Sequence, residues 1–296
     1  MAYMITADES RMITAGQKEI FMKNFESFAI EYTEYTTPKK ATKKTETYDS
    51  MGNLQAAVEK IEGGNIQYGK VEQAYQTSIT NKTWANGFAH TIEAIKYDLY
   101  GVVNSVKAKE LSRTMRELEE ANAAYWLDNA FAVNMTDGQP LCTNSRPLFN
   151  VPGSFNDTLT TGGLTPDNLK TAIAMFARFK NHAGGPMKSR ASDLITHSVN
   201  MITVEEIFAS TLKAYELSNT SNKLPKLTPH YSTYMASETA WFLEDKNFDH
   251  ILFQWFMKTE FDSDEDKTNT KNLYYNAIAM YQTGALPNIG IVGSAG

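Results

Sequence analysis

The longest helical pattern of the chain begins at Thr91, ends at Phe131 and reads TIEAIKYDLYGVVNSVKAKELSRTMRELEEANAAYWLDNAF. It contains no proline, and Gly101 is its single glycine. Thr91 is a favourable N-cap, and a helix without a kink near residues 101–104 would be about 60 Å long. Such a length predicts an extended, plate-like subunit. The apolar residues that repeat at helical spacing are Leu99, Val103, Val106, Leu111, Met115, Leu118 and Tyr125.

Two pairs of opposite charge lie four residues apart within this segment. They are Arg113 with Glu117 and Arg116 with Glu120. Residues at this spacing are neighbours on a helix surface, where such pairs add modest stability. We therefore predict that both pairs lie on the solvated side of the helix.

Two further helices have clear start signals. Thr165 is a predicted N-cap followed by Pro166 and Asp167, and the glycines at 184–185 are expected to end that helix. Residues 203–206 read TVEE, a capping box that opens the second helix. Strands are expected at 194–196, at 231–235 and at several places between 273 and 292. Helices and strands interleave without a regular βαβ rhythm, so the predicted fold class is α+β.

The first part of the chain, residues 1–55, combines a short helical pattern with a stretch rich in threonine and lysine. That stretch, at 36–47, reads TTPKKATKKTET. Its lysines suit contact with phosphate or with an acidic neighbouring subunit, and a solvated mobile arm is the alternative interpretation. We expect the arm to gain little stability from contacts with its own chain and to be ordered by a partner. The lysines are Lys39, Lys40, Lys43 and Lys44.

Residues 56–90 hold too few apolar side chains for a core of their own. The turn signal EGGN at 62–65 precedes Ile66 and Tyr68, which alternate with polar residues as in a strand. A long hairpin that reaches away from the body fits this pattern, because two strands alone need something else to pack against. A surface loop is the alternative.

The composition excludes several classes of protein. The chain has 296 residues, a formal net charge of −6 and 42% hydrophobic residues, which predicts a folded, soluble protein that does not wrap nucleic acid by net positive charge. A single cysteine, Cys142, excludes an internal disulfide and a four-cysteine zinc site. No secretory signal is expected at the N-terminus. Residues 272–296 are uncharged but hold too many polar residues and glycines for a membrane span.

A search for catalytic and metal-binding patterns returns mostly negatives. The chain lacks GxGxxG after a strand, GxxxxGK[ST], HExxH and GxSxG. Its five histidines show no ligand spacing, and Cys142 as a nucleophile is a remote alternative. Residues 262–266 imitate a calcium loop, but Lys267 stands where glycine is required and Leu273 where glutamate is. We therefore expect an exposed acidic loop there, and no catalytic residue, metal or cofactor.

Seven motifs follow one another along the chain. They are EGGNIQYGK at 62–70, NGFAHTIEAIKYDLY at 86–100, ELSRTM at 110–115, LDNAF at 127–131, DGQPLCTNSRP at 137–147, SDLITHS at 192–198 and TAWFLED at 239–245. In this order they resemble the Mu-like major head subunit family of tailed bacteriophages, and the resemblance covers nearly the whole chain. Departures from the family pattern are Cys142 for phenylalanine, Arg146 for histidine, and Thr196 with His197 for prolines.

The resemblance implies a Hong Kong 97-type capsid fold. The implied parts are an N-terminal arm at 1–55, an extended hairpin loop at 56–90, a peripheral domain with a long spine helix at 91–185, an axial domain at 186–265, and a return to the peripheral sheet at 266–296. The arm and the hairpin would then have little core of their own because their buried surface lies between chains.

The implied function is that of a major capsid protein whose copies form hexamers and pentamers and close an icosahedral shell around double-stranded DNA. Implied partners are further copies of the chain, a portal, a separate scaffolding protein, a possible decoration protein and the packaged DNA, with no membrane. The implied location is the virion capsid, assembled in the host bacterial cytoplasm. The alternatives are a nanocompartment shell of the encapsulin type and a soluble hydrolase. The residues predicted to contact other subunits are Lys39, Lys40, Lys43, Lys44, Glu62, Asn65, Tyr68, Lys70 and Tyr75.

Overall fold

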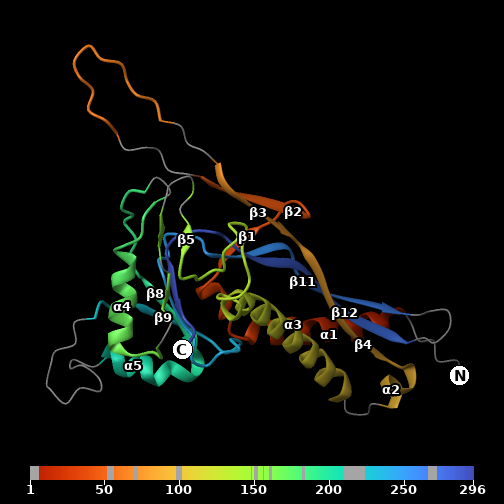
Figure 1. Ribbon diagram of the computed structural model, residues 1–296. Coiled ribbons are helices and arrows are strands. Elements are labelled where there is room, and N and C mark those ends of the chain that lie inside the picture. Colours follow the sequence, from red (N-terminus) through yellow and green to blue (C-terminus); the bar gives the residue numbers. More distant parts are fainter. Residues whose placement is uncertain are drawn as a thin grey trace, which may run out of the picture.

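A computed structural model of the chain shows a broad body with one long projection (Figure 1). The residues that it describes are 7–51, 57–69, 73–97, 102–147, 149, 153–155, 157–159, 162–181, 184–209, 224–265 and 272–296. Among the helices in these ranges, none is long and apolar enough to cross a membrane.

The segment that begins at Thr91 contains two described helices. Helix α2 spans Ile92–Tyr97, and α3, the spine helix, spans Val102–Asp128. Thr91 caps α2 as predicted, because the backbone N–H of Ala94 donates to its hydroxyl at 3.3 Å. Residues 98–101, which include Leu99 and the first position of the predicted kink, lie outside the described residues. The 27 residues of α3 give it a length of about 40 Å.

The spine helix and the N-terminal helix α1 (Ala7–Ser27) pack together beside a four-stranded sheet (Figure 1). Its strand order is β1 (Thr37–Lys40), β11 (Ile251–Glu265), β12 (Leu273–Ala285) and β4 (Lys82–His90). Strand β1 runs parallel to β11, and the other pairings are antiparallel. Phe21 of α1 packs on Phe261 of β11 with ring centroids 5.0 Å apart. Aromatic contacts of this kind fill the core between the helices and the sheet.

A five-stranded sheet forms the other part of the body. Its strand order is β7 (Thr158–Leu159), β13 (Ile291–Ser294), β10 (Trp241–Glu244), β8 (Asp193–His197) and β9 (Thr228–Ser232). Helices α4 (Pro166–Phe176) and α5 (Met201–Ala209) contribute buried side chains to its core. Side chains alternate along β10, so Phe242 enters the core of the spine helix while Trp241 and Leu243 enter that of α4. One strand therefore joins the two cores.

Two small sheets complete the molecule. Strand β2 (Thr45–Met51) pairs with β3 (Gln73–Thr80) in an antiparallel hairpin, and β5 (Arg146–Pro147) pairs with β6 (Ser154–Phe155). The short 3-10 helices are η1 (Tyr32–Glu34) and η2 (Ser198–Asn200). The fold is α+β, as predicted.

The helix starts and ends differ from the sequence-based expectations in detail. The side chain of Thr165 accepts the N–H of Asn168, which confirms it as the N-cap of α4. Helix α4 nevertheless ends at Phe176, before the glycines at 184–185. Helix α5 begins at Met201, so Thr203 lies inside its first turn and is not its cap. Helix η2 precedes α5 directly and already sets the helical path before the TVEE signal is reached.

The predicted strands are partly confirmed. Residues 194–196 lie in β8, but the strand expected at 231–235 occupies Thr228–Ser232, because its partner β8 sets the register. The strands described between 272 and 296 are β12 and β13. The expected acidic loop at 262–266 is wrong for residues 262–265, which continue β11 and pair with β12.

The predicted charge pairs of the spine helix have opposite outcomes. Arg113 and Glu117 form the exposed pair, with their nitrogen and oxygen 2.8 Å apart. The placement of Arg116 and Glu120 on the solvated side is wrong, because both are buried. Arg116 pairs instead with the buried Glu119 at 2.6 Å. Two positions that the apolar spacing assigned to the core are exposed, namely Val106 and Tyr125.

These buried charges are neutralised or hydrogen-bonded by segments distant in sequence. Glu120 accepts the backbone N–H groups of Glu31 and Tyr32, each at 2.9 Å. Arg116 donates to the carbonyl of Phe25 at 3.1 Å and stacks over its ring at 3.8 Å. The spine helix therefore holds the end of α1 and the start of η1 through charged side chains that would otherwise be costly to bury.

The stretch at 36–47 is ordered by contacts with its own chain. The expectation that it gains little stability from such contacts is therefore wrong. Its first residues form β1 at the edge of the four-stranded sheet, and Lys39 pairs with Asp249 at 3.1 Å. The carboxylate of Glu46 accepts the N–H groups of Thr42 and Lys43, which closes the turn before β2. The strand that pairs with β1 lies near the other end of the sequence, where no local pattern could point to it.

Replacing Glu120 by alanine is expected to lower the free energy of unfolding by about 2 kcal/mol, since two buried N–H groups lose their acceptor. Urea unfolding followed by tryptophan fluorescence measures the change. The control is Glu117→Ala on the same helix, whose exposed ion pair contributes little. Equal effects of the two substitutions would contradict this assignment.

Candidate intersubunit surfaces

The hairpin of β2 and β3 carries a loop that leaves the body (Figure 1). Its described residues, 57–69, have no regular secondary structure, and every one of them is exposed. Four large apolar side chains stand free on it, with exposed fractions of 66% for Val58, 78% for Ile61, 60% for Ile66 and 88% for Tyr68. Apolar side chains gathered in this way mark a surface that binds another molecule.

The base of the hairpin is fixed to the four-stranded sheet by Gln254 of β11. Its amide nitrogen donates to Asn81 Oδ1 at 2.9 Å, and its amide oxygen accepts the hydroxyl proton of Tyr48 at 2.9 Å. Ile79 of β3 packs closely onto Gly284 of β12. A Cβ atom added to Gly284 would lie 2.3 Å from Ile79 Cδ1. The hairpin that carries the loop is therefore held against the four-stranded sheet.

The predicted contact residues on the loop lie where such contacts are possible. Glu62, Asn65 and Tyr68 are exposed in the projecting segment, whereas Lys70 lies outside the described residues. Tyr75 is half-buried, lies near the end of the hairpin from which the loop leaves, and packs edge-on against Phe149, with ring centroids 5.3 Å apart.

The lysines of the arm are not part of the projecting loop. All four side chains are exposed along β1 and the turn that follows it. The turn is held by Asn81. Its side chain donates to the carbonyl of Lys43 at 3.1 Å, and its backbone N–H donates to the carbonyl of Lys44 at 2.8 Å. The chain itself therefore sets the backbone of this turn and, through the pair with Asp249, the side chain of Lys39.

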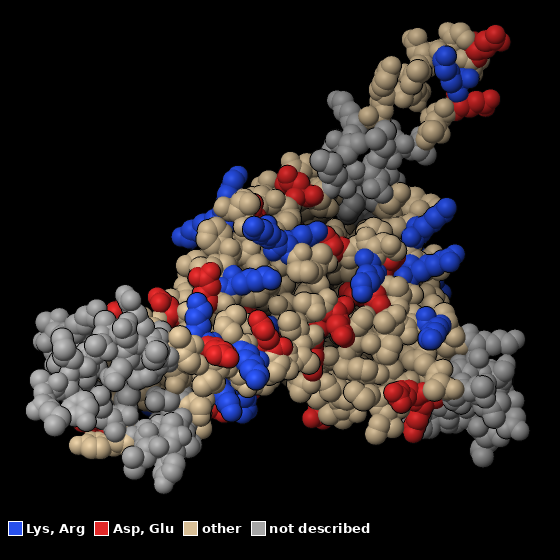
Figure 2. All heavy atoms as spheres, turned by 180° about the vertical axis from the view of Figure 1, so that it is seen from behind, with Lys and Arg blue, Asp and Glu red and all other residues tan. Residues whose placement is uncertain are grey.

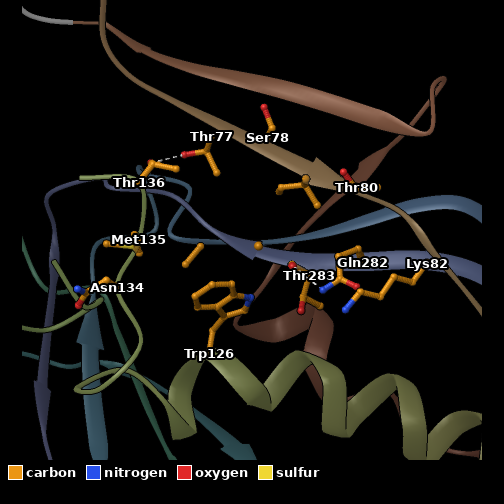
Figure 3. A pocket seen from close by; sticks show the side chains of 13 residues that line it. Thr77, Ser78, Thr80, Lys82, Trp126, Asn134, Met135, Thr136, Gln282 and Thr283 are labelled. Carbon is orange, nitrogen blue, oxygen red and sulfur yellow. Dashed lines mark hydrogen bonds between the residues drawn. The ribbon is translucent and has the colours of Figure 1, made fainter. Parts of the chain in front are cut away.

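A cavity of about 420 Å³ lies beneath β3, between the hairpin, the end of the spine helix and β12 (Figure 3). Its walls are residues 77–80 of β3, Lys82 at the start of β4, Trp126 of α3, residues 134–136 of the following turn, and residues 282–285 of β12. The hydroxyls of Thr77 and Thr136 are 2.8 Å apart at one side. Sequence reasoning missed this surface because its walls come from four separate segments.

A group of ionisable side chains joins the N-terminal segment to the five-stranded sheet. His230 Nε2 lies 3.1 Å from Asp193 Oδ1, and His230 Nδ1 lies 3.2 Å from Glu34 Oε2. Glu244 lies opposite Asp193 in the pairing of β10 with β8. Burial, together with the nearby charge of Asp193, raises the pKa of Glu244 to about 8.

The candidate nucleophile Cys142 is fully enclosed. Burial raises the pKa of its thiol, which opposes formation of the reactive thiolate. Beside it, the buried Arg146 pairs with Asp137 and, at 2.9 Å, with Asp157, and it also donates to the carbonyl of Leu141 at 2.8 Å. Arg146 thus ties this loop together. Within the described residues, no group of three or more His, Cys, Asp or Glu side chains could hold a metal ion.

The raised pKa of Glu244 predicts a loss of stability with rising pH. The folded state keeps a proton that the unfolded chain releases above about pH 4.5, so this residue makes unfolding easier between about pH 4.5 and pH 8, by at most about 1.4 kcal/mol per pH unit. Glu244→Gln should flatten the dependence of the unfolding free energy on pH across this window. The exposed Glu260→Gln is the control, and an unaltered slope in Glu244→Gln would contradict the assignment.

Comparison with solved structures shows the fold of the chain. The asymmetric unit of the bacteriophage PhiM1 mature capsid aligns with a TM-score of 0.56 and 8% identity, over 90% of this chain and 87% of that one. A virus-like particle from Pyrococcus furiosus aligns with a TM-score of 0.55 and 10% identity, over 94% of this chain and 97% of that one. A protein of Microbacterium phage Oxtober96 aligns with a TM-score of 0.53 and 11% identity, over 90% of this chain and 91% of that one. The fold is therefore the Hong Kong 97-type capsid fold.

Comparison with sequences identifies the family. No curated protein matches the chain. Residues 74–286 match the family described as phage capsid protein, and this range runs from β3 through the spine helix to the end of β12, so that β1 and β13 lie outside it. Since the match covers more than half of the chain, the chain belongs to the phage capsid protein family.

Proposed function

We propose that this chain is the major head subunit of a tailed bacteriophage, whose copies form hexamers and pentamers and close an icosahedral shell around double-stranded DNA. Membership of the phage capsid family supports the role in the shell. The exposed loop at 57–69 supports assembly most directly, because its apolar side chains find no cover on their own subunit. The chain is also proposed to belong to the Mu-like branch of the family.

The proposed division into arm, hairpin loop, peripheral domain and axial domain follows the resemblance, but several of its bounds are adjusted. Strands β2 and β3 form the hairpin, so it includes residues 45–51 of the proposed arm. Residues 82–90 pair with β12 and belong to the four-stranded sheet. We assign the spine helix and this sheet to the peripheral domain, which moves β11 out of the predicted axial range 186–265. We assign the five-stranded sheet with α4 and α5 to the axial domain, which moves β7, α4 and β13 out of the predicted peripheral ranges.

Two alternatives are less well supported. A nanocompartment shell of the encapsulin type shares the fold, as the likeness to the virus-like particle illustrates, but the family match favours a phage capsid. A hydrolase that uses Cys142 is opposed by the complete burial of this thiol. The capsid family is a structural one, and the described residues suggest no catalytic chemistry.

The proposed partners are other copies of the chain, a portal, a separate scaffolding protein, a possible decoration protein and the packaged DNA, with assembly in the host bacterial cytoplasm. Contact with DNA would be weak and non-specific. The face drawn in Figure 2 supports this, because blue and red side chains are interspersed across it. This face would not hold DNA as a single basic surface.

The assembly role predicts that the loop is needed for shells but not for folding. In the double substitution Ile66→Asp with Tyr68→Asp, charged side chains oppose burial at the contact, so closed shells should be lost. Negative-stain microscopy with light scattering detects the shells, and thermal unfolding of the subunit should be unchanged. Glu59→Gln in the same loop is the control. Normal shells from the double variant would refute the role of the loop.

The exposed lysines predict a salt-dependent contribution to contacts between subunits. Replacing Lys40, Lys43 and Lys44 together by glutamine should weaken assembly at low salt and reduce its sensitivity to added NaCl, because fewer charges remain to be screened. Light scattering over a salt series measures both effects. The control is Lys170→Gln, which removes an exposed lysine of α4. The same salt response in both variants would argue against contact through the arm.

A further inference from the structure

The cavity beneath β3 contains two buried polar atoms that lack a partner among the described residues. They are Nε1 of Trp126, which can only donate, and Oε1 of Gln282, which can only accept. Figure 3 shows the indole of Trp126 across the cavity, with its nitrogen edge turned towards Gln282 and Thr283. Unpaired buried polar atoms are costly, and one donor together with one acceptor matches the carbonyl and N–H of a peptide backbone.

The cavity also adjoins an unpaired strand edge. Within the described residues, β3 pairs with β2 alone. Four consecutive residues of β3, 77–80, line the cavity. A strand face would contribute alternate residues, so this contact is with the edge of β3. An open strand edge is a template on which another extended segment can pair.

The remaining walls include an apolar part, which suits a segment with apolar side chains on one side, and polar side chains such as Lys82, Asn134 and Thr283. Ile79, Met135 and Ala285 line the cavity together with the ring of Trp126. Residues 65–69 of the projecting loop read NIQYG, and they place Ile66 and Tyr68 on one side of an extended chain. Both side chains are exposed, and this loop is not among the residues that line the cavity of its own subunit.

We infer that the cavity beneath β3 receives residues 65–69 of the projecting loop of a second copy of this chain. The incoming segment pairs with the free edge of β3, accepts the indole N–H of Trp126 and donates an N–H to Gln282 Oε1. Ile66 and Tyr68 then cover the apolar walls. This inference rests on the proposed assembly function and names the surface that receives the loop.

Disulfide trapping tests the contact in assembled shells. Subunits carrying Tyr68→Cys are co-assembled with subunits carrying either Ser78→Cys or Asn134→Cys, which line the cavity. Mild oxidation should produce dimers with one subunit of each kind, while the buried native Cys142 stays unreacted. The control partner is Ile202→Cys, exposed on α5.

The outcomes separate this inference from the function on which it rests. Closed shells in which neither cavity position forms a disulfide with residue 68 would overturn the inference and leave the shell function standing. A wild-type chain that forms no shells, even with a scaffolding protein, would overturn both.

A matched pair of substitutions tests the role of the indole. Trp126→Phe removes an N–H that is unpaired in the free subunit, so it should raise the subunit concentration needed for half-assembly about 5-fold while leaving the unfolding of the free subunit little changed. Trp84→Phe removes an N–H that donates to the Tyr281 carbonyl at 3.3 Å within the chain, so it should destabilise the free subunit instead. An unchanged assembly threshold in Trp126→Phe would overturn the inference and indicate that water pairs with these atoms.

Discussion

The contacts of Tyr281 connect the parts of the subunit that carry its surfaces. Its ring is buried and packs on Phe253 of β11 at 5.0 Å, and its hydroxyl accepts a hydrogen bond from Asn122 of the spine helix at 3.0 Å. Its backbone carbonyl accepts the indole N–H of Trp84 on β4. The next residues of β12, 282–284, line the cavity and support the hairpin. A shift of Tyr281 would therefore move the helix, the sheet and the intersubunit surfaces together.

Local sequence patterns were sufficient for those elements whose stability is decided locally. Thr91 and Thr165 act as the predicted N-caps, because the hydrogen bond of a cap involves only the next few residues. The spine helix followed from the periodicity of its apolar residues and the absence of proline, and the α+β class from the interleaving of helix and strand signals. The ordered motifs, taken together, led to the capsid fold that the structural likenesses show.

The errors in burial and strand pairing arose where a distant segment decides the outcome. Arg116 and Glu120 have the spacing of a surface pair, but α1 and η1 cover that face and provide a carbonyl, a ring and two N–H groups. Strand β1 finds its partner in β11, near the other end of the sequence. The cavity beneath β3 depends on four segments at once, and nothing in any one of them distinguishes Trp126 or Gln282 from ordinary core residues.

A binding segment that lies away from the matching surface of its own subunit forces association between copies. The loop at 57–69 leads away from the body, whereas the cavity lies under β3 (Figures 1 and 3). Contact between two different surfaces of one chain is heterologous, so each new copy leaves another loop and another cavity free until a ring closes. The net charge of −6 on each subunit opposes crowding. Assembly then requires that the attraction between loop and cavity outweigh the electrostatic repulsion between subunits. This requirement favours the one geometry in which the loop fits the cavity.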